Sequence, residues 1–305
     1  MTRVVQIVMA TRNGARFLPA QLNSIAEQKH QSWQLLVGDD RSDDGTRAIL
    51  RGFAARHPGR VCIVTGPGQG VAANFLNLTQ RAVERAPGMP LVFADQDDLW
   101  WPGRLGSALA GMDAGAGDVV AHASRIVLID AQDRYLGCGG RVQRGPSFGN
   151  ALVQNVLPGH ALALSPAAAR TLARSAPVAL AAGVAFHDWW AYLLVAAVGG
   201  RITLGTEVTV GYRQHRGAQF GYGARHRIAR ACAAISGTYA DWISANLAAL
   251  ARIEDVSPEA RRLAESFSDA RINRRAHLSI GRHGVHRQGG AGDMALRALA
   301  FIGRL

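Results

Sequence analysis

The segment LVFADQDDLWWP at Leu91–Pro102 constrains the fold and the function of this chain more than any other segment. Its first four residues are apolar and typical of a strand buried on both faces of a parallel sheet. The carboxylates of Asp95, Asp97 and Asp98 follow at once, and burying a carboxylate is costly unless its charge is compensated. Because Asp95 and Asp97 are two residues apart, both can bind one hard cation such as Mg²⁺ or Mn²⁺. Ligands of open α/β sheets bind beyond the carboxyl ends of strands, so the segment predicts a metal between protein and diphosphate, with a helix-capping acidic turn as the alternative.

The composition allows a large folded core but leaves the kind of partner open. The chain has 305 residues, of which 48% are hydrophobic and 18% charged. This fits one large α/β domain, or a domain of about 200 residues with an extension. The net charge is +12, and Lys29 is the only lysine, so the basic residues are almost all arginines, which suit bidentate phosphate binding. Nucleic acid, an anionic membrane and a phosphorylated small substrate all fit this charge.

The cysteines and the apolar segments favour a cytoplasmic protein. Cys62, Cys138 and Cys232 are far apart and have no paired spacing, so we expect neither a zinc site nor a disulfide framework. The N-terminus is typical of a strand entering a turn rather than of a signal peptide. Ser175–Gly200 is the most membrane-like segment, but His187-Asp188 lies at its middle, so we expect no transmembrane helix there.

Apolar runs alternate with helical patterns along the first part of the chain, which predicts βαβ units and an α/β fold with a mostly parallel sheet flanked by helices. The expected strands are Val4–Met9, Gln34–Gly38, Val61–Thr65, Leu91–Ala94, Val119–Ser124 and Ile126–Ile129 with a turn or bulge between them, Ile202–Leu204 and Val208–Tyr212. The expected helices include Val71–Glu84, Phe186–Val198, Ile228–Leu247 and Pro258–Arg271. We predict one domain at residues 1–220 and an Arg- and Ala-rich helical C-terminal extension at residues 221–305.

Three further segments follow predicted strands and carry polar residues. The turn Thr11–Gly14 and the pair Asp39-Asp40 are at strand ends, where they can face a ligand, a base or a ribose. The alternatives are an ordinary strand–helix connection and helix-capping chemistry. The Gly66–Gly70 loop with Asn74 predicts either a rim for phosphate or a plain surface loop.

Two later motifs add candidates for chemistry. Asp188 begins a predicted helix, where an acid either caps the helix or acts as a general base on a hydroxyl group. Trp189 and Trp190 offer an aromatic face to a sugar or belong to the core. In the segment Tyr212–Gly217, arginines and His215 can surround a pyrophosphate, and His215 can ligate a metal; the alternative is a solvated basic loop.

Taken together, the ordered motifs resemble inverting family 2 glycosyltransferases with the GT-A fold. The matching segments are TRNG, QLNSIAEQKHQSWQLLVGDDRSDDGT, FADQDDLWWPGRL, HDWW and YRQH. The last three are similar to a bacterial branch that includes many rhamnosyltransferases of surface polysaccharide synthesis. The resemblance covers residues 3–216 and leaves the C-terminal third without a counterpart.

The resemblance implies a role for each candidate residue, with Asp188 as the catalytic base. Asp39 would bond the pyrimidine base, Asp95 would contact the ribose or the metal, and Asp98 would support Asp97. Relatives more often have Glu where this chain has His187, which affects the expected acceptor contacts. The implied nucleotide-sugar-binding residues are Thr11, Arg12, Asn13, Asp39, Asp40, Asn74, Asp95, Gln96 and Arg213. The implied acceptor or sugar contacts are His187, Trp189 and Trp190, and the implied metal ligands are Asp97, Asp95 and His215.

The sequence therefore predicts a bacterial, metal-dependent inverting glycosyltransferase that uses Mg²⁺ or Mn²⁺. The donor would be a dTDP-, UDP- or GDP-sugar, with dTDP-rhamnose as the named candidate, and the acceptor a hydroxyl of a glycan or lipid-linked sugar. The C-terminal helices would contact the anionic inner face of the cell membrane or form a homodimer. One alternative is a catalytically silent relative that binds nucleotide sugar or glycan. A nucleic-acid-binding protein is disfavoured because no zinc-finger or RNA-recognition motif is present, and a nicotinamide oxidoreductase because the glycine fingerprint is missing.

Overall fold

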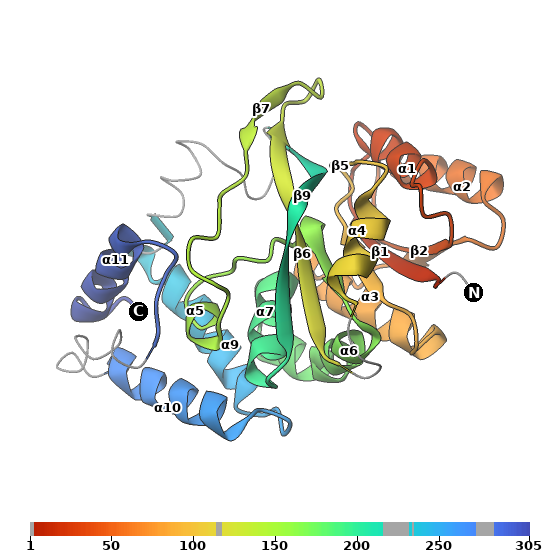
Figure 1. Cartoon of the computed structure of the whole chain (residues 1–305). Coiled ribbons are helices and arrows are strands. Elements are labelled where there is room, and N and C mark those ends of the chain that lie inside the picture. Colours follow the sequence, from red (N-terminus) through yellow and green to blue (C-terminus); the bar gives the residue numbers. More distant parts are fainter. Residues whose placement is uncertain (1–2, 114–117, 216–231, 234, 273–283) are drawn as a thin grey trace.

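The computed structural model describes residues 3–113, 118–215, 232–233, 235–272 and 284–305, which are the coloured parts of Figure 1. The strands within these residues are β1 (Val5–Thr11), β2 (Trp33–Asp39), β3 (Val61–Thr65), β4 (Leu91–Ala94), β5 (Leu99–Trp100), β6 (Val120–Ile129), β7 (Tyr135–Cys138), β8 (Leu162–Leu164) and β9 (Arg201–Arg213). They form one sheet in the order β3-β2-β1-β4-β8-β6-β9-β5, with β7 paired to β6.

The half of the sheet built from β3, β2, β1 and β4 is parallel, as predicted. In this half, β1 and β4 are buried along their whole length, which explains their continuous apolar sequences. Thr11 at the end of β1 is in register with Asp39 at the end of β2. Because all four strands point the same way, the residues that follow them gather at one edge of the sheet.

The other half makes the sheet mixed rather than mostly parallel. Strand β8 is antiparallel to β4 and β6, and β9 is parallel to β6 but antiparallel to β5. The expected strands Val119–Ser124 and Ile126–Ile129 join as the single strand β6, and Ile202–Leu204 and Val208–Tyr212 join as β9. The pairing of β6 with β9 shifts register around Arg125, which is the expected bulge rather than a turn.

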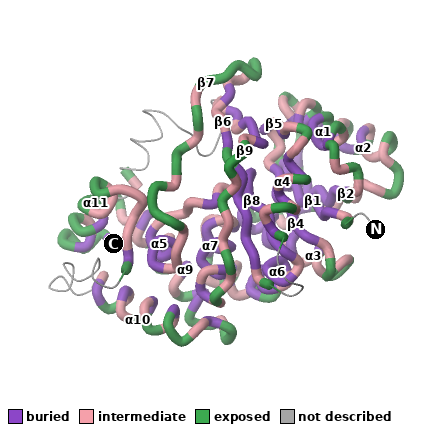
Figure 2. The backbone as a smooth tube through the Cα atoms, viewed as in Figure 1, coloured by how far each residue is buried: buried purple, intermediate pink, exposed green. Residues whose placement is uncertain are grey.

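Helices cover both faces of the sheet (Figure 1). One face carries α1 (Leu18–Ala26), α2 (Thr46–Arg56) and α4 (Arg104–Gly111). The other carries α3 (Val71–Arg85), α6 (Pro166–Ala181) and α7 (His187–Ala197). The side chains of β1 alternate between these layers, because successive residues of a strand point to opposite faces. Figure 2 shows the resulting buried centre.

The described residues of the C-terminal segment are mainly helical, as predicted, and pack against the sheet domain, while the start of the predicted helix Ile228–Leu247 lies outside the described residues. It contains α9 (Thr238–Leu250), α10 (Pro258–Ile272) and α11 (Gly290–Phe301). Helix α9 contacts α6, and the Tyr239 hydroxyl donates a hydrogen bond to the carbonyl oxygen of Val153. Arg144 and Asp293 form an ion pair of 2.7 Å. The predicted domain boundary at residue 220 lies outside the described residues and stays a prediction.

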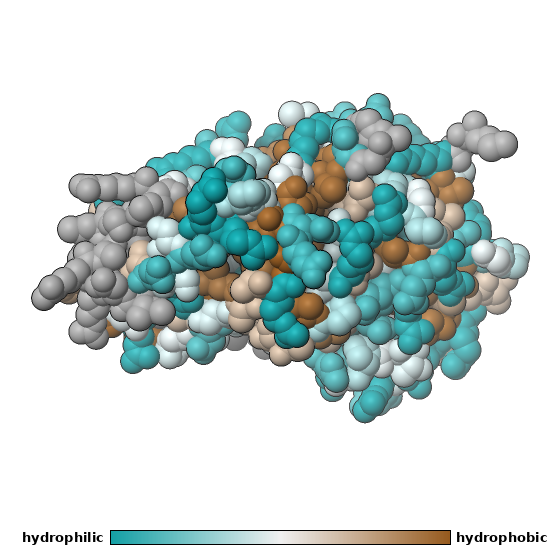
Figure 3. Space-filling model, turned by 90° about the horizontal axis from the view of Figure 1, so that it is seen from below, coloured by the Kyte–Doolittle hydropathy of each residue, from teal (hydrophilic) through white to brown (hydrophobic). Residues whose placement is uncertain are grey.

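Two short elements complete the fold, α5 (Phe148–Ala151) and the 3₁₀ turn η1 (Gly159–Ala161). The membrane-like segment Ser175–Gly200 is divided between the end of α6 and α7. Across the part of the chain that the structure describes, every helix is too short or too polar to cross a membrane. On the face shown in Figure 3, hydrophobic areas are interspersed among hydrophilic side chains.

Candidate active site

Asp39 organises the end of the first two strands. One of its carboxylate oxygens accepts hydrogen bonds from the hydroxyls of Thr11 (3.2 Å) and Ser42 (2.5 Å), and the other accepts from the Ser42 amide (3.2 Å) and Arg47 Nε (2.6 Å). Burial alone would raise the pKa of Asp39, but the hydrogen bonds from Ser42 and Arg47 outweigh it and lower this pKa. These four donors fill the acceptor positions of the carboxylate. Since Arg47 is 46% exposed, it is the donor that a ligand can displace.

Asp40 and Asn74 shape the Gly-rich loop at the same edge. The carboxylate of Asp40 accepts hydrogen bonds from the backbone amides of Gly68 and Gly70. Asn74, near the start of α3, donates 2.8 Å to the Gly38 carbonyl oxygen, and its own carbonyl oxygen is buried without a partner. A Cβ on Gly38 would lie 2.2 Å from that oxygen, so only glycine allows this approach. The loop predicted as a rim for phosphate is thus held by Asp40, while Asn74 joins α3 to the end of β2.

Gln96 joins the acidic turn, Asp95–Asp98, to the first loop, Arg12–Gly14, which follows β1. Its side-chain oxygen accepts from the Arg12 amide at 3.0 Å, and its side-chain nitrogen donates to the Arg12 carbonyl oxygen at 3.0 Å. Asn13 has a positive φ of 50° and accepts from the Asp43 amide at 3.0 Å. The structure therefore brings Thr11, Arg12, Asn13, Asp39, Asp40 and Gln96 together at one sheet edge.

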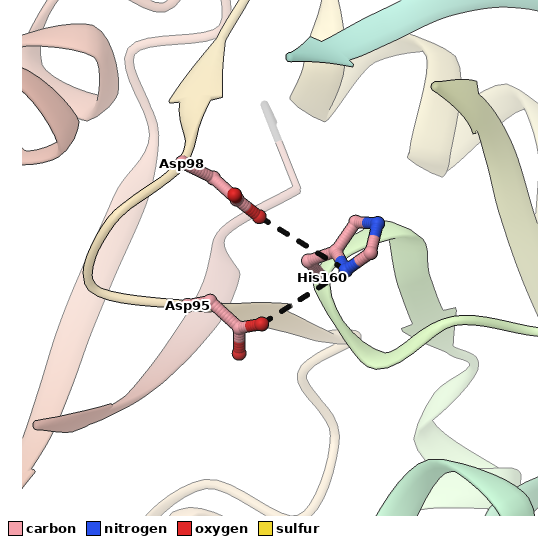
Figure 4. Close-up of side chains that lie close together, drawn as sticks. All are labelled: Asp95, Asp98 and His160. Atoms are coloured by element: carbon pink, nitrogen blue, oxygen red, sulfur yellow. Dashed lines mark ion pairs between the residues drawn. The ribbon is translucent and has the colours of Figure 1, made fainter. Parts of the chain in front are cut away.

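Asp95, Asp98 and His160 point toward one another (Figure 4). The ligand atoms of the three side chains lie within 4.8 Å of one another. Asp98 is fully buried, and although one oxygen accepts from the Arg213 amide at 3.0 Å, the other has no hydrogen-bond partner. The His160 ring is stacked on Tyr212 with 4.2 Å between ring centroids, which fixes its orientation.

Burial and neighbouring charges raise the pKa of the two carboxyl groups in this cluster and lower the pKa of the histidine. The Asp95 side chain keeps 32% exposure, but partial burial and the charges of Asp97 and Asp188 still raise its pKa to about 8. Burial and the two neighbouring carboxylates raise the pKa of Asp98 well above its ordinary value. Burial lowers the pKa of His160 to about 3. A neutral imidazole beside carboxylates that lack a counter-charge is a donor set that fits a divalent cation.

Asp97, between Asp95 and Asp98 in the sequence, pairs with His215. The distance from Asp97 Oδ2 to His215 Nε2 is 2.8 Å. Arg213 is buried beneath this pair and donates 2.7 Å from Nε to the Asp97 carbonyl oxygen. It also forms an ion pair with Asp133. The two predicted metal ligands Asp97 and His215 are therefore in contact. Arg213 bonds protein groups through Nε and Nη1, its Nη2 has no hydrogen-bond partner among the described residues, and its part in nucleotide binding stays a prediction.

Asp188, the predicted base, is at the start of α7. Its two carboxylate oxygens accept from the backbone amides of Gly159 and Trp189, each at 2.8 Å. Gly159 bonds Asp188, and the next residue, His160, faces Asp95 and Asp98, so the carboxylates border the same short turn. Asp188 therefore lies beside the acidic turn with both oxygens oriented by the backbone.

The residues on either side of Asp188 are buried. Trp189 and Trp190 are 5% and 0% exposed, and their indole nitrogens donate to the Ala151 carbonyl oxygen and the Ser175 hydroxyl. His187 is 7% exposed and stacked on Phe75 at 4.1 Å between ring centroids. All three side chains belong to the core, which is the alternative that the sequence left open for the two tryptophans, and a contact of the three with an acceptor or a sugar stays a prediction.

Sequence reasoning missed His160 and Arg104. His160 is in a segment that the sequence showed only as a loop before a short strand, and the ligand-type imidazole beside Gly159 was the one available signal. Arg104 is fully buried, bonds the Ser124 hydroxyl and the Leu162 carbonyl oxygen, and its charge helps to keep His160 neutral.

Comparisons with known proteins agree with this architecture. Residues 6–151 match the family model "Glycosyl transferase family 2". The dTDP-rhamnosyl transferase RfbG of Shigella flexneri is 32% identical over 103 residues, which are 33% of this chain and 35% of RfbG. WfgD of Escherichia coli, a UDP-Glc:alpha-D-GlcNAc-diphosphoundecaprenol beta-1,3-glucosyltransferase, is 31% identical over 102 residues, 33% of this chain and 38% of WfgD.

The fold has a counterpart over nearly the whole chain. The crystal structure of S. aureus TarS 1–349 in complex with UDP-GlcNAc matches 97% of this chain and 90% of that chain, with a TM-score of 0.51 and 15% identity. Residues 6–151 thus belong to glycosyl transferase family 2, and the chain has the GT-A fold, as the sequence predicted. The chain spans less than half the length of the curated relatives that it matches.

Proposed function

We propose that this chain is a metal-dependent inverting glycosyltransferase that moves a sugar from a nucleotide diphosphate to an acceptor hydroxyl. The observation that carries the proposal is that the turn Gly159–Ala161 brings Asp188 beside the acidic cluster in a chain whose residues 6–151 match family 2: the Gly159 amide bonds Asp188, and the adjacent His160 ring faces Asp95 and Asp98. The carboxyl edge of the parallel strands carries Asp39 and the loops that we propose for the nucleotide. Ligands of open α/β sheets bind at this edge.

The nucleotide would bind between the first loop and the Gly-rich loop. Thr11, Arg12 and Asn13 would line this pocket, with Asp39 directed at the base and Asp40 and Asn74 holding the loop beside it. The close network around Asp39 supports this assignment because it keeps an ionised acceptor in a fixed position. Gln96 would set the distance between this pocket and the acidic turn through its two bonds to Arg12.

The residues at the acidic turn fit a divalent cation. Asp95, Asp97 and His215 would hold Mg²⁺ or Mn²⁺, with Asp98 in support, and the unpartnered oxygen of Asp98 is the sign of an uncompensated site. When bound, the metal would neutralise charge on the diphosphate leaving group.

Asp188 would take the proton from the acceptor hydroxyl as that oxygen attacks the anomeric carbon opposite the leaving group. This attack inverts the configuration and requires no covalent intermediate on the protein. The two backbone amides that orient the carboxylate support the role, because a general base must be fixed within hydrogen-bond reach of its proton. Holding donor and acceptor in line would supply much of the rate.

Named relatives guide the choice of donor and acceptor. RfbG is a dTDP-rhamnosyl transferase, WfgD uses UDP-Glc on a diphosphoundecaprenol-linked sugar, and TarS binds UDP-GlcNAc. They support a pyrimidine nucleotide donor, with dTDP-rhamnose as the first candidate, and a bacterial glycan or lipid-linked acceptor.

A lipid-linked acceptor would bring the C-terminal helices to a cytoplasmic membrane surface. Met294, Phe301 and Ile302 at α11 are more than half exposed, and Arg297 and Arg304 lie beside them in the sequence. Arginines attract acidic lipids, and exposed apolar side chains insert among them. Vesicles with anionic lipid should bind the protein at low salt and release it at high salt, and binding that does not depend on salt would contradict the electrostatic part.

The deciding experiment is nucleotide release from a panel of UDP-, GDP- and dTDP-sugars, with Mn²⁺ or with a chelator. We expect one donor to react, metal to be required and Asp188→Asn to abolish transfer while donor binding remains. Donor binding, measured by calorimetry on the same samples, distinguishes a reaction that fails because the acceptor is missing from a function that is wrongly proposed. Absence of binding to every donor would overturn the proposal, and metal-dependent binding with no turnover on any acceptor would favour a silent relative.

A further inference from the structure

The turn η1 lies between the proposed base, Asp188, and the acidic turn Asp95–Asp98. Its first residue faces Asp188, and its second residue faces the acidic turn. Gly159 contacts Asp188 through its backbone amide, and His160 faces Asp95 and Asp98 through its ring. The turn packs against β4, β6, α7 and β9, of which β4 leads into Asp95 and α7 carries Asp188. Figure 4 shows the His160 side of this arrangement.

The contact between Gly159 and Asp188 determines where the carboxylate points. One oxygen of Asp188 is bonded to the amide of Trp189, its own neighbour on α7. The other is bonded to Gly159, at 2.8 Å, from a different part of the chain. A carboxylate bonded at one oxygen can rotate about its χ2 torsion, which is broad for Asp, whereas bonds from two directions fix it.

Only glycine permits this contact. A Cβ at position 159 would lie 2.9 Å from His187 Nε2 and 3.4 Å from Asp188 Cβ. The His187 ring cannot move away easily, because it is buried, stacked on Phe75 and close to Phe93 at 5.3 Å between ring centroids. Gly159 does not have a positive φ, so the requirement is for space rather than for backbone freedom.

We propose that Gly159 is a positioning residue that holds Asp188 in the orientation needed to accept the proton of the acceptor hydroxyl. The inference rests on the proposed role of Asp188 as the base. The neighbouring His160, stacked on Tyr212, ties the same turn to the acidic cluster. The turn η1 thus fixes the position of Asp188 relative to the acidic cluster, where we propose that the diphosphate leaving group binds.

The test is Gly159→Ala, with Gly88→Ala as the matched control because a Cβ at Gly88 would meet nothing within 4 Å. We expect kcat for transfer to fall by about 10-fold or more while the donor Kd stays within about twofold, because the added methyl group displaces the turn and misaligns the base. The control should keep both values. A kcat within about twofold of wild type, or a parallel loss of donor binding, would overturn the proposal.

A second measurement covers the case in which Gly159→Ala does not fold. Amide hydrogen exchange at Gly159 in wild-type protein and in Asp188→Ala should show faster exchange in the variant, because its acceptor is gone. Unchanged exchange would overturn the proposal. Asp188→Asn distinguishes failure of the base assignment from failure of the Gly159 proposal. Full transfer by this variant would overturn both. Inactivity of Asp188→Asn with a neutral Gly159→Ala would remove the inference alone.

Discussion

The Nδ1 atom of His160 lies 3.9 Å from Oδ2 of Asp95. The same nitrogen lies 4.0 Å from Oδ2 of Asp98, so one ring nitrogen faces two carboxylates. Both distances exceed the limit of about 3.2 Å for a hydrogen bond, and the imidazole is neutral at physiological pH. The three side chains therefore form no hydrogen bonds with one another. Their oxygen and nitrogen atoms border a common space, as expected of ligands for a cation.

Asp97→Asn tests the predicted metal ligand. We expect Mn²⁺ affinity, measured from the electron paramagnetic resonance signal of free Mn²⁺, to fall by at least about 10-fold, because a carboxylate ligand is lost. Asp269→Asn, an exposed acid on α10, is the control and should bind as wild type does. Equal affinity in both variants would show that Asp97 is not a ligand.

Asp39→Asn tests the nucleotide pocket. The amide cannot accept all four hydrogen bonds that the carboxylate accepts and lacks the charge that pairs with Arg47. A charge-assisted bond is worth about 1.5–3 kcal/mol, so we expect UDP or dTDP to bind roughly 10- to 100-fold more weakly by calorimetry. Asp43→Asn alters an exposed acid of the same loop and serves as the control. If the two variants bind nucleotide equally well, Asp39 has no part in the pocket.

Asn74→Ala tests the buried amide that joins α3 to the end of β2. The change removes the 2.8 Å bond to the Gly38 carbonyl oxygen, and we expect the free energy of unfolding in urea to drop by about 1–3 kcal/mol. Asn77→Ala on the same helix is the matched control, and its cost should stay within about 0.5 kcal/mol, since it loses only an exposed bond with Arg81. Equal costs in the two variants would contradict the structural role of Asn74.

His122→Asn tests a buried histidine away from the acidic turn. Burial and the charge of Arg104 lower the pKa of His122 to about 4, so between about pH 6.5 and 4 the unfolded chain binds a proton that the folded chain does not. The stability contributed by the neutral ring is therefore present above pH 6.5 and lost as the pH falls toward 4.

The measurement is the difference in unfolding free energy between wild type and His122→Asn at pH 7.5 and at pH 5. Asn keeps a polar atom near Thr203, the partner of Nδ1 at 2.9 Å, so the fold is retained. We expect the advantage of wild type to shrink by about 1–2 kcal/mol at the lower pH. A difference that stays constant with pH would show that His122 titrates normally.

The carboxyl-edge residues could be predicted from sequence because each one directly follows an apolar run. Asp39 ends β2 and Asp95 follows β4, and parallel pairing then brings them to one edge. The contact between Asp97 and His215 could only be proposed from the family motifs, since β9 reaches the acidic turn through its antiparallel pairing with β5. The burial of Trp190 was left open, because a strongly apolar helix does not reveal which of its side chains face a ligand.

The sequence by itself determined the alternation of strands and helices, the acids at the strand ends and the resemblance to a glycosyltransferase family, because these depend on neighbouring residues. The tertiary structure decided that the sheet is mixed, that His160 enters the acidic cluster and that Gly159 contacts Asp188. The reason is that β8 is inserted between β4 and β6 and places the turn before it beside both β4 and α7. Strand order depends on packing across the whole sheet, which a local pattern does not record.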